Sequence, residues 1–153
     1  MILSIMGDVK SVYANGIKAL AKIQMQDTAI INIKFKNGGL GYLEATTATR
    51  PKDLEGSLTV LGTEGSVVVG GYAMNKIDEW IFTKSKKEDN SIRKTNIKIN
   101  NVYGYGHSLF YKEVINNLKF KKKFPIKLND AIKVVKLIEA IKKSIKYKKI
   151  INL

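Results

Sequence analysis

The sequence of 153 residues contains no cysteine, one histidine, two prolines and two arginines. Without cysteine it has no disulfide framework and no thiolate metal site, and a single histidine cannot build a histidine-based zinc centre. No apolar run approaches the roughly 20 residues that cross a bilayer, so we expect no membrane association. The first residues lack the basic segment and cleavage site of a signal peptide. We therefore expect a cytoplasmic protein.

The usual catalytic signatures are also missing from the sequence. No G-x-G-x-x-G motif follows a predicted strand, no phosphate loop is present, and no G-x-S-x-G elbow supplies a nucleophile. The carboxylates Asp78, Glu79, Glu88 and Asp89 lie on a predicted strand and a polar loop, where we interpret them as solvated surface. We predict no catalytic, cofactor-binding or metal-binding residue in this chain.

The formal net charge of +14 has two interpretations. A basic surface can bind nucleic acid or another anion. However, lysine outnumbers arginine 25 to 2, and isoleucine and asparagine are also abundant, a mixture that A/T-rich codons produce without any partner. Because arginine is the usual residue for bidentate phosphate and base contacts, we favour compositional drift. A basic domain that binds an anion or nucleic acid remains the alternative function.

The first two thirds of the sequence have the period of β-strands. Ile31, Ile33 and Phe35 alternate with polar residues, and the Asn37-Gly38-Gly39 run is typical of a hairpin turn before a strand at 40–45. A second hairpin is predicted at 57–71 and a further strand at 75–84. Residues 85–96 are predicted as a polar loop, and residues 97–103 as a short strand.

The last third changes to a helical period. One helix is predicted from Ser108, ending before Pro125, and a second from about Asn129, its predicted N-cap, to Lys146. Its predicted buried stripe contains Val134, Leu137, Ile138, Ile141 and Ile145. Strands followed by helices indicate an α+β fold, in which helices pack on one face of an open antiparallel or mixed sheet. We expect a single domain over residues 1–153.

An open sheet leaves its second face uncovered. We expect that face to carry residues such as Leu43, Val68 and Trp80. A second subunit normally covers an apolar sheet face, so the pattern predicts a homo-oligomer through this face.

Four segments occur in a characteristic order: DTAIINIKFKNGGLGYLEAT, LTVLGTEGSVVVGGYAMNKIDEWIF, YGYGHSLFYKEVINNL and NDAIKVVKLIEAIKKSI. This order resembles the C-terminal domain of the Gfo/Idh/MocA oxidoreductases, from about Val9 to Ile145. Gly-Thr-x-Gly-Ser followed by Gly-His-Ser-x-x-Tyr is the more specific part. The pieces GGYAMNKIDEW and VYGYGHSLFY look most like the branch that oxidises C3 of UDP-linked amino sugars.

The resemblance implies the substrate-side and oligomerisation domain of an NAD- or NADP-dependent sugar oxidoreductase, with a nucleotide sugar as substrate. In the family, a Rossmann domain binds the cofactor, and a Glu-Lys-Pro motif and an Asp-x-x-x-His pair supply the acid–base residues. Neither motif lies within these 153 residues. Hydride transfer needs a nicotinamide held against the substrate carbon. We therefore expect the isolated chain to be inactive.

The resemblance also places the Gly-His turn near the sugar pocket. It implies substrate binding by His107, with Tyr103, Tyr105 or Tyr111 lining the pocket. The alternative is that His107 caps the helix or stabilises the turn while the tyrosines pack on the sheet. Asn75 and Lys76 are further candidates for substrate contacts, although we expect both on an exposed loop.

Overall fold

The computed structural model describes residues 1–122, 124 and 126–153, and the chain divides into two compact units. Unit 1 comprises Met1–Arg50 and Pro125–Leu153, and unit 2 comprises Pro51–Phe124. The expected single domain therefore stays a prediction. Pro125, the predicted stop of the first long helix, lies outside the described residues.

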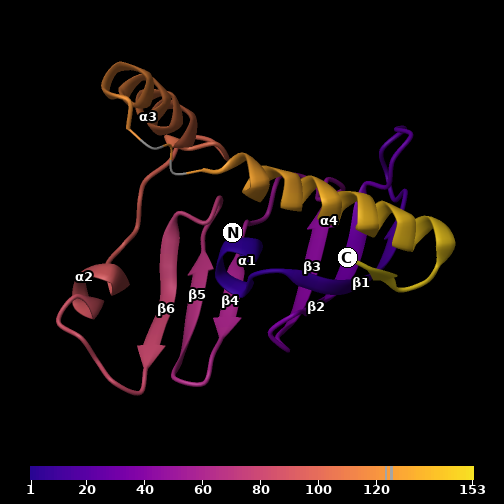
Figure 1. Cartoon of the computed structure of the whole chain (residues 1–153), viewed down its shortest axis with the longest axis horizontal. Coiled ribbons are helices and arrows are strands. Elements are labelled where there is room, and N and C mark those ends of the chain that lie inside the picture. Colours follow the sequence, from indigo (N-terminus) through magenta and orange to yellow (C-terminus); the bar gives the residue numbers. More distant parts are fainter. Residues whose placement is uncertain (123, 125) are drawn as a thin grey trace. The chain divides into compact units, whose positions relative to one another are not determined.

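Unit 1 is a four-stranded antiparallel sheet with helices on one face. The strand order is β3-β2-β1-β7, with β1 at Val9–Ile17, β2 at Thr28–Phe35, β3 at Leu40–Thr46 and β7 at Ile151–Asn152. Helix α4 (Leu128–Tyr147) packs across β1, and the short α1 (Ile2–Met6) packs against the same core (Figure 1). The α+β class with an open antiparallel sheet is confirmed.

The core of unit 1 follows the alternation of the strands. The predicted Ile31, Ile33 and Phe35 are all buried. They meet buried residues of β1 and α4, which are Val9, Val12, Ala14, Leu137 and Ala140. Strand β1 was not predicted, because a register shift between Val9 and Ser11 breaks its alternation.

The buried stripe of α4 differs from the prediction. Leu137, Ala140 and Ser144 are buried, whereas Val134 and Ile138 are about half exposed. The predicted buried stripe is therefore rotated about the helix axis, toward Val134 and Ile138, relative to the stripe that is buried. The helix also begins one residue before Asn129, which is not its N-cap: Lys127 occupies that position and makes no side-chain capping bond.

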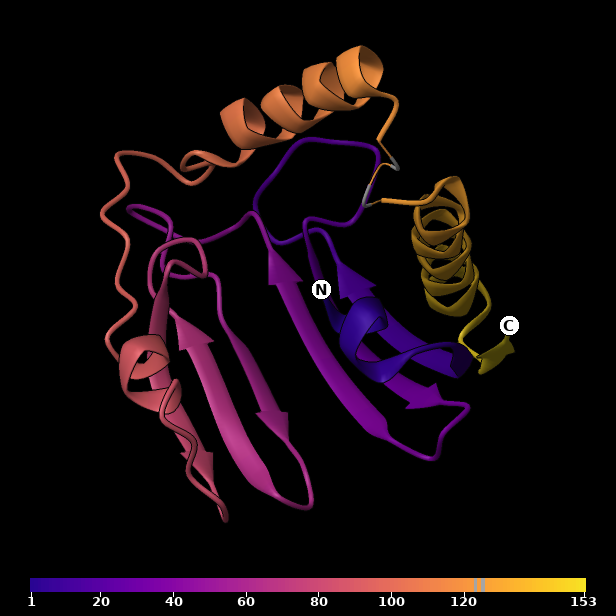
Figure 2. The ribbon, with the colours of Figure 1, turned by 60° about the vertical axis from the view of Figure 1, so that its left-hand side comes forward.

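Unit 2 contains a three-stranded antiparallel sheet in the order β4-β5-β6, shown with its two helices in Figure 2. The strands are β4 (Leu58–Leu61), β5 (Gly65–Gly70) and β6 (Lys76–Phe82). The helices are α2 (Asp89–Arg93), which packs against β6, and α3 (Gly106–Phe120). Both predicted hairpins and both long helices are therefore present.

Two predictions for the segment after β6 are wrong. The predicted loop at 85–96 contains α2, whose residue Asp89 is buried rather than solvated. The Asp89 carboxylate accepts hydrogen bonds from the Trp80 indole at 2.9 Å and from the Lys86 backbone N–H at 2.6 Å. Residues 97–103 form no strand; a single bridge joins the preceding Asn96 to Lys76.

The assignment of the open face is also wrong in part. Leu43 pairs with the buried Ile31, and cross-strand partners share a face, so Leu43 lies on the helix-covered face. In unit 2, Trp80 pairs with Val67, which places Trp80 and Val68 on opposite faces. The open face of unit 1 instead carries the exposed apolar residues Ile17, Ile30, Leu40 and Tyr42.

Candidate functional site at the head of helix α3

The turn before α3 is built from its own backbone. The backbone N–H of Gly104 donates to the Asn101 carbonyl at 3.1 Å, and the Asn101 side-chain oxygen accepts the Tyr103 N–H at 2.9 Å. Gly104 has a φ of +52°, in the left-handed region that favours glycine. A Cβ added at Gly104 would lie 3.2 Å from an Ile99 methyl group. The turn therefore needs glycine at this position.

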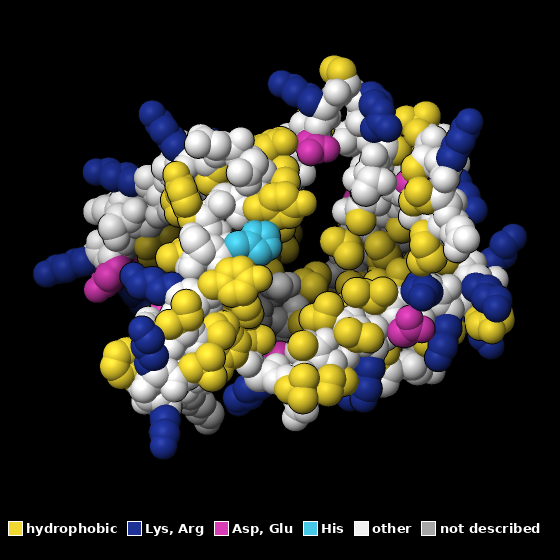
Figure 3. Space-filling view, turned by 90° about the horizontal axis from the view of Figure 1, so that it is seen from above, with side chains coloured by type: hydrophobic (Ala, Val, Ile, Leu, Met, Phe, Trp, Pro, Cys, Tyr) yellow, Lys and Arg dark blue, Asp and Glu magenta, His cyan; other side chains and the backbone are white. Residues whose placement is uncertain are grey.

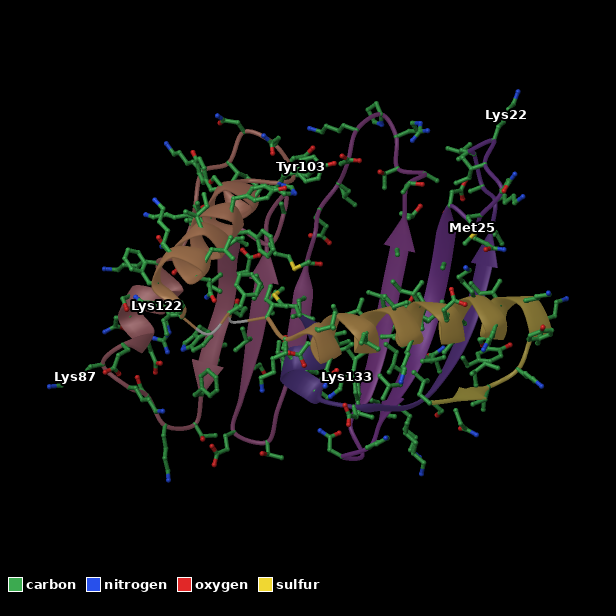
Figure 4. All side chains as sticks on the ribbon, turned by 45° about the horizontal axis from the view of Figure 1, so that its top comes forward. Lys22, Met25, Lys87, Tyr103, Lys122 and Lys133 are labelled. Atoms are coloured by element: carbon green, nitrogen blue, oxygen red, sulfur yellow. The ribbon has the colours of Figure 1, made fainter. Side chains whose placement is uncertain are left out.

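This turn brings two of the predicted site residues together. The rings of Tyr103 and His107 lie 5.4 Å apart at an interplanar angle of 57°, a tilted aromatic contact. Both side chains are exposed; Figure 3 shows the imidazole in cyan at the surface, and Figure 4 labels Tyr103 at the head of α3. Among the described residues the imidazole has no hydrogen-bond partner, and the residue is exposed, so it is open to a ligand.

Tyr105 precedes α3 directly, and Tyr111 lies one turn inside the helix. The Tyr105 carbonyl accepts the Ser108 hydroxyl at 2.9 Å and the Leu109 N–H at 3.2 Å, which closes the first turn of α3. Tyr111 follows His107 by four residues, so the two share one face of the helix. Both tyrosine rings are more than half exposed. The head of α3 thus presents three tyrosine rings and one imidazole to solvent.

Asn75 and Lys76 have partners of their own. The Asn75 side chain accepts the Ala73 N–H at 3.1 Å and donates to the Ile97 carbonyl at 2.8 Å, so it holds the turn before β6. Lys76 forms an ion pair with Asp78. Within the described part of the chain, no hydrogen bond or ring contact joins either side chain to the His107 cluster.

Sequence reasoning missed a buried carboxylate in unit 1. Asp27 is only 4% exposed, and its oxygens accept the backbone N–H groups of Ala19, Leu20 and Ala21 at 2.7 to 2.8 Å. These bonds lower the pKa of Asp27 far below its ordinary value. They hold the loop at 18–26, on which Figure 4 labels Lys22 and Met25. This carboxylate is structural, because the loop amides use both of its oxygens.

Apart from residues 123 and 125, no group of three or more histidine, aspartate or glutamate side chains is placed to hold a metal ion. Over the same residues, no helix has both the length and the apolar character needed to cross a membrane.

Two of the solved structures that resemble this chain are WlbA dehydrogenases. The WlbA dehydrogenase from Bordetella pertussis, solved with NADH and UDP-GlcNAcA, is 36% identical over 99% of this chain, with a TM-score of 0.91. The WlbA dehydrogenase from Chromobacterium violaceum, solved with the same two molecules, is 32% identical over 99% of this chain, with a TM-score of 0.87. The present chain covers 44% and 42% of these proteins, less than half of their length.

A more distant structure shares only the fold. Levoglucosan dehydrogenase, solved with NADH and L-sorbose, is 16% identical over 99% of this chain, with a TM-score of 0.74, and the chain covers 46% of it. The comparison with curated proteins found no match. Residues 1–153 match the family described as "Oxidoreductase family, C-terminal alpha/beta domain". The chain therefore belongs to the Gfo/Idh/MocA oxidoreductase family, as its C-terminal α/β domain.

Proposed function

We propose that this chain is the substrate-side domain of an NAD- or NADP-dependent nucleotide-sugar oxidoreductase. The observation that carries the proposal is the match of 99% of the chain, at 36% and 32% identity, to two dehydrogenases solved with NADH and UDP-GlcNAcA. The proposed substrate class, a nucleotide sugar, is taken from the UDP-GlcNAcA in both structures. We place the working enzyme in the cytoplasm, because it is proposed to use a nicotinamide coenzyme as its hydride carrier.

The chain's own residues do not fit a nicotinamide dinucleotide. No glycine-rich phosphate motif occurs in the sequence. This chain covers less than half of the length of the two relatives. We therefore assign the binding of NAD or NADP to the part of the enzyme that this chain does not match. The cofactor supplies the hydride acceptor, and we assign no catalytic residue to these 153 residues. The isolated chain is proposed to bind substrate without oxidising it.

The head of α3 is the proposed substrate contact. The imidazole of His107 can donate or accept a hydrogen bond to a sugar hydroxyl, because it has no partner among the described residues. Tyr103 lies against it and holds its ring in place. Tyr105 and Tyr111, at the same end of α3, add exposed rings with hydroxyl groups. Asn75 and Lys76 stay predictions, since their side chains already bond to Ala73, Ile97 and Asp78.

A hybrid enzyme tests the proposal. This chain would replace the matching part of the B. pertussis WlbA dehydrogenase, and NADH absorbance would follow oxidation of UDP-GlcNAcA. We expect activity in the hybrid and none in the isolated chain. Binding of UDP-GlcNAcA to the isolated chain, measured by calorimetry, checks the same site without depending on assembly of the hybrid. A folded hybrid that binds NADH but not UDP-GlcNAcA would contradict the proposal.

Substitutions then test the residues. His107→Ala should weaken UDP-GlcNAcA binding by about 3- to 10-fold, the value of one hydrogen bond. Tyr147→Ala is the matched control, because this tyrosine is also more than half exposed but lies at the end of α4. Equal binding by the two variants would remove His107 from the proposed site.

We also propose a homo-oligomer through the open face of the unit 1 sheet. Four apolar side chains are exposed there, Ile17, Ile30, Leu40 and Tyr42, and a face of this kind suits a second subunit. Light scattering after size exclusion should give an oligomer at low salt and at about 0.5 M salt, where the Debye length is about 4 Å. Ile30→Lys should give a monomer, whereas Leu54→Lys, at an exposed residue outside the strands, should not.

A further inference from the structure

Two asparagine–glycine pairs occur in unit 1, in different backbone settings. Asn15-Gly16 lies within β1, and Asn37-Gly38 lies in the turn that joins β2 to β3. We propose that Asn37 is a self-modification site, at which the backbone nitrogen of Gly38 converts the side-chain amide to a carboxylate. The proposal does not depend on the function proposed above.

The turn presents the reacting groups to water. Asn37 and Gly38 are both exposed, and Gly38 has a φ of +91° and no Cβ that would crowd its nitrogen. The backbone N–H of Gly39 donates to Asn37 Oδ1 at 3.0 Å. That donor polarises the carbonyl that is attacked and stabilises negative charge developing on its oxygen. Only one described hydrogen bond holds the attacking nitrogen, from Gly38 N–H to the Phe35 carbonyl at 3.1 Å.

The reaction proceeds in two balanced steps. The Gly38 nitrogen loses its proton to solvent base and forms a bond to Asn37 Cγ. The Cγ–Nδ2 bond then breaks, and Nδ2 leaves as ammonia after taking up a proton, which leaves a five-membered cyclic imide. Water next adds to either imide carbonyl and opens the ring, which produces aspartate or isoaspartate. No oxidant, reductant or cofactor is needed.

Asn15 provides an internal control with the same two-residue sequence. Asn15 pairs with Ile30 and Gly16 pairs with Ala29 in the β1–β2 ladder. In a strand the side chain stands perpendicular to the sheet, whereas the next backbone N–H lies in the sheet plane. The Gly16 nitrogen therefore cannot approach Asn15 Cγ until the strand opens. The fold should direct the reaction to Asn37.

The modification would release a tertiary contact. Asn37 Nδ2 donates to the Met6 carbonyl at 3.1 Å, which ties the hairpin turn to the end of α1. A carboxylate has no N–H to donate, and its charge faces the carbonyl oxygen. The product should therefore hold α1 less tightly than the original chain does.

Peptide mapping by mass spectrometry tests the proposal. The 153-residue chain is incubated at 37 °C and pH 8, folded and in guanidinium chloride, and conversion is measured at both asparagines. In the folded chain we expect Asn37 to be converted at least about tenfold faster than Asn15, because Asn15 must wait for local opening of the strand. In denaturant the two rates should lie within about threefold of each other, because the strand pairing is lost.

Two variants complete the test. Asn37→Gln keeps an amide but lengthens the side chain, and should stop conversion at this position. Asn37→Asp reproduces the aspartate product, and should speed hydrogen exchange of the Gly7 amide, which donates to the Leu3 carbonyl at the end of α1. The proposal is overturned if folded Asn37 stays intact while denatured Asn37 reacts, or if Asn15 reacts as fast as Asn37 in the folded chain.

Discussion

Replacement of Ser144 by alanine should destabilise unit 1 more than its small size suggests. Ser144 is fully buried on α4, and its hydroxyl oxygen accepts the backbone N–H of Ala14 at 2.9 Å. The same hydroxyl donates to the Lys149 carbonyl at 2.7 Å. Strand β7 pairs only with Ser11 and Val12, so the β1 edge at Ala14 lies beyond its reach. The Ser144 hydroxyl therefore accepts the Ala14 N–H, which no residue of β7 reaches.

The magnitude follows from the burial of these groups. Ala14 is itself buried, so its N–H would lose its only described partner and stay out of reach of water. An unsatisfied buried donor costs about 1 to 3 kcal/mol in the free energy of unfolding. The Lys149 carbonyl belongs to an exposed residue and can be hydrated instead. We therefore expect a loss of about 1 to 3 kcal/mol for Ser144→Ala.

Urea unfolding followed by far-UV circular dichroism measures this loss. For a urea dependence of about 2 kcal/mol per M, the midpoint should fall by about 0.5 to 1.5 M. Ser91→Ala is the matched control, because its hydroxyl also donates to a backbone carbonyl, that of Glu88 at 2.7 Å, but is exposed. The control should change stability by less than about 0.5 kcal/mol.

A local readout separates this explanation from a general loss of packing. Hydrogen exchange of the Ala14 amide should speed up in Ser144→Ala under native conditions. Fluorescence of Trp80, the chain's one tryptophan, reports on unit 2 in the same urea titration. An unchanged midpoint together with unchanged exchange at Ala14 would refute the reasoning.

Three further predictions concern the carboxylates and the turn. Three backbone N–H groups lower the pKa of Asp27 in the folded chain. Its contribution to the free energy of unfolding is therefore present above about pH 4 and is lost as the pH falls further. Asp27→Asn should flatten this acid dependence of the urea midpoint. Hydrogen bonds from the Lys86 N–H and the Trp80 indole lower the pKa of Asp89, so acidification and Asp89→Asn should both shift the tryptophan emission maximum. Asp53→Asn should not shift it, because the Asp53 side chain is exposed and its described partner is the Tyr72 hydroxyl at 3.4 Å. Gly104→Ala should cost about 1 kcal/mol at its positive φ and weaken UDP-GlcNAcA binding, because it moves the turn that carries the proposed site; Gly106→Ala, with open space at its Cβ, should bind normally.

The sequence by itself was sufficient for strands β2 to β6 and for the long helices α3 and α4. The alternation of Ile31, Ile33 and Phe35 predicted the buried face of β2, because a strand repeats every two residues. The helical period after Ser108 predicted α3 and α4, and the order of the motifs indicated the family. The strand and helix periods depend only on residues that are close in the sequence, so the sequence alone predicts them.

The tertiary structure decided what depends on distant partners. Asp89 was interpreted as solvated until α2 placed its carboxylate beside the Trp80 indole. Ser144 was not singled out in the sequence, and only the fold shows that its hydroxyl accepts a strand amide 130 residues away. Tyr103 and His107 were both candidates, but only the turn at Gly104 shows that their rings are in contact. Burial of a polar group is favourable only when a partner meets it, and the fold alone supplies that partner.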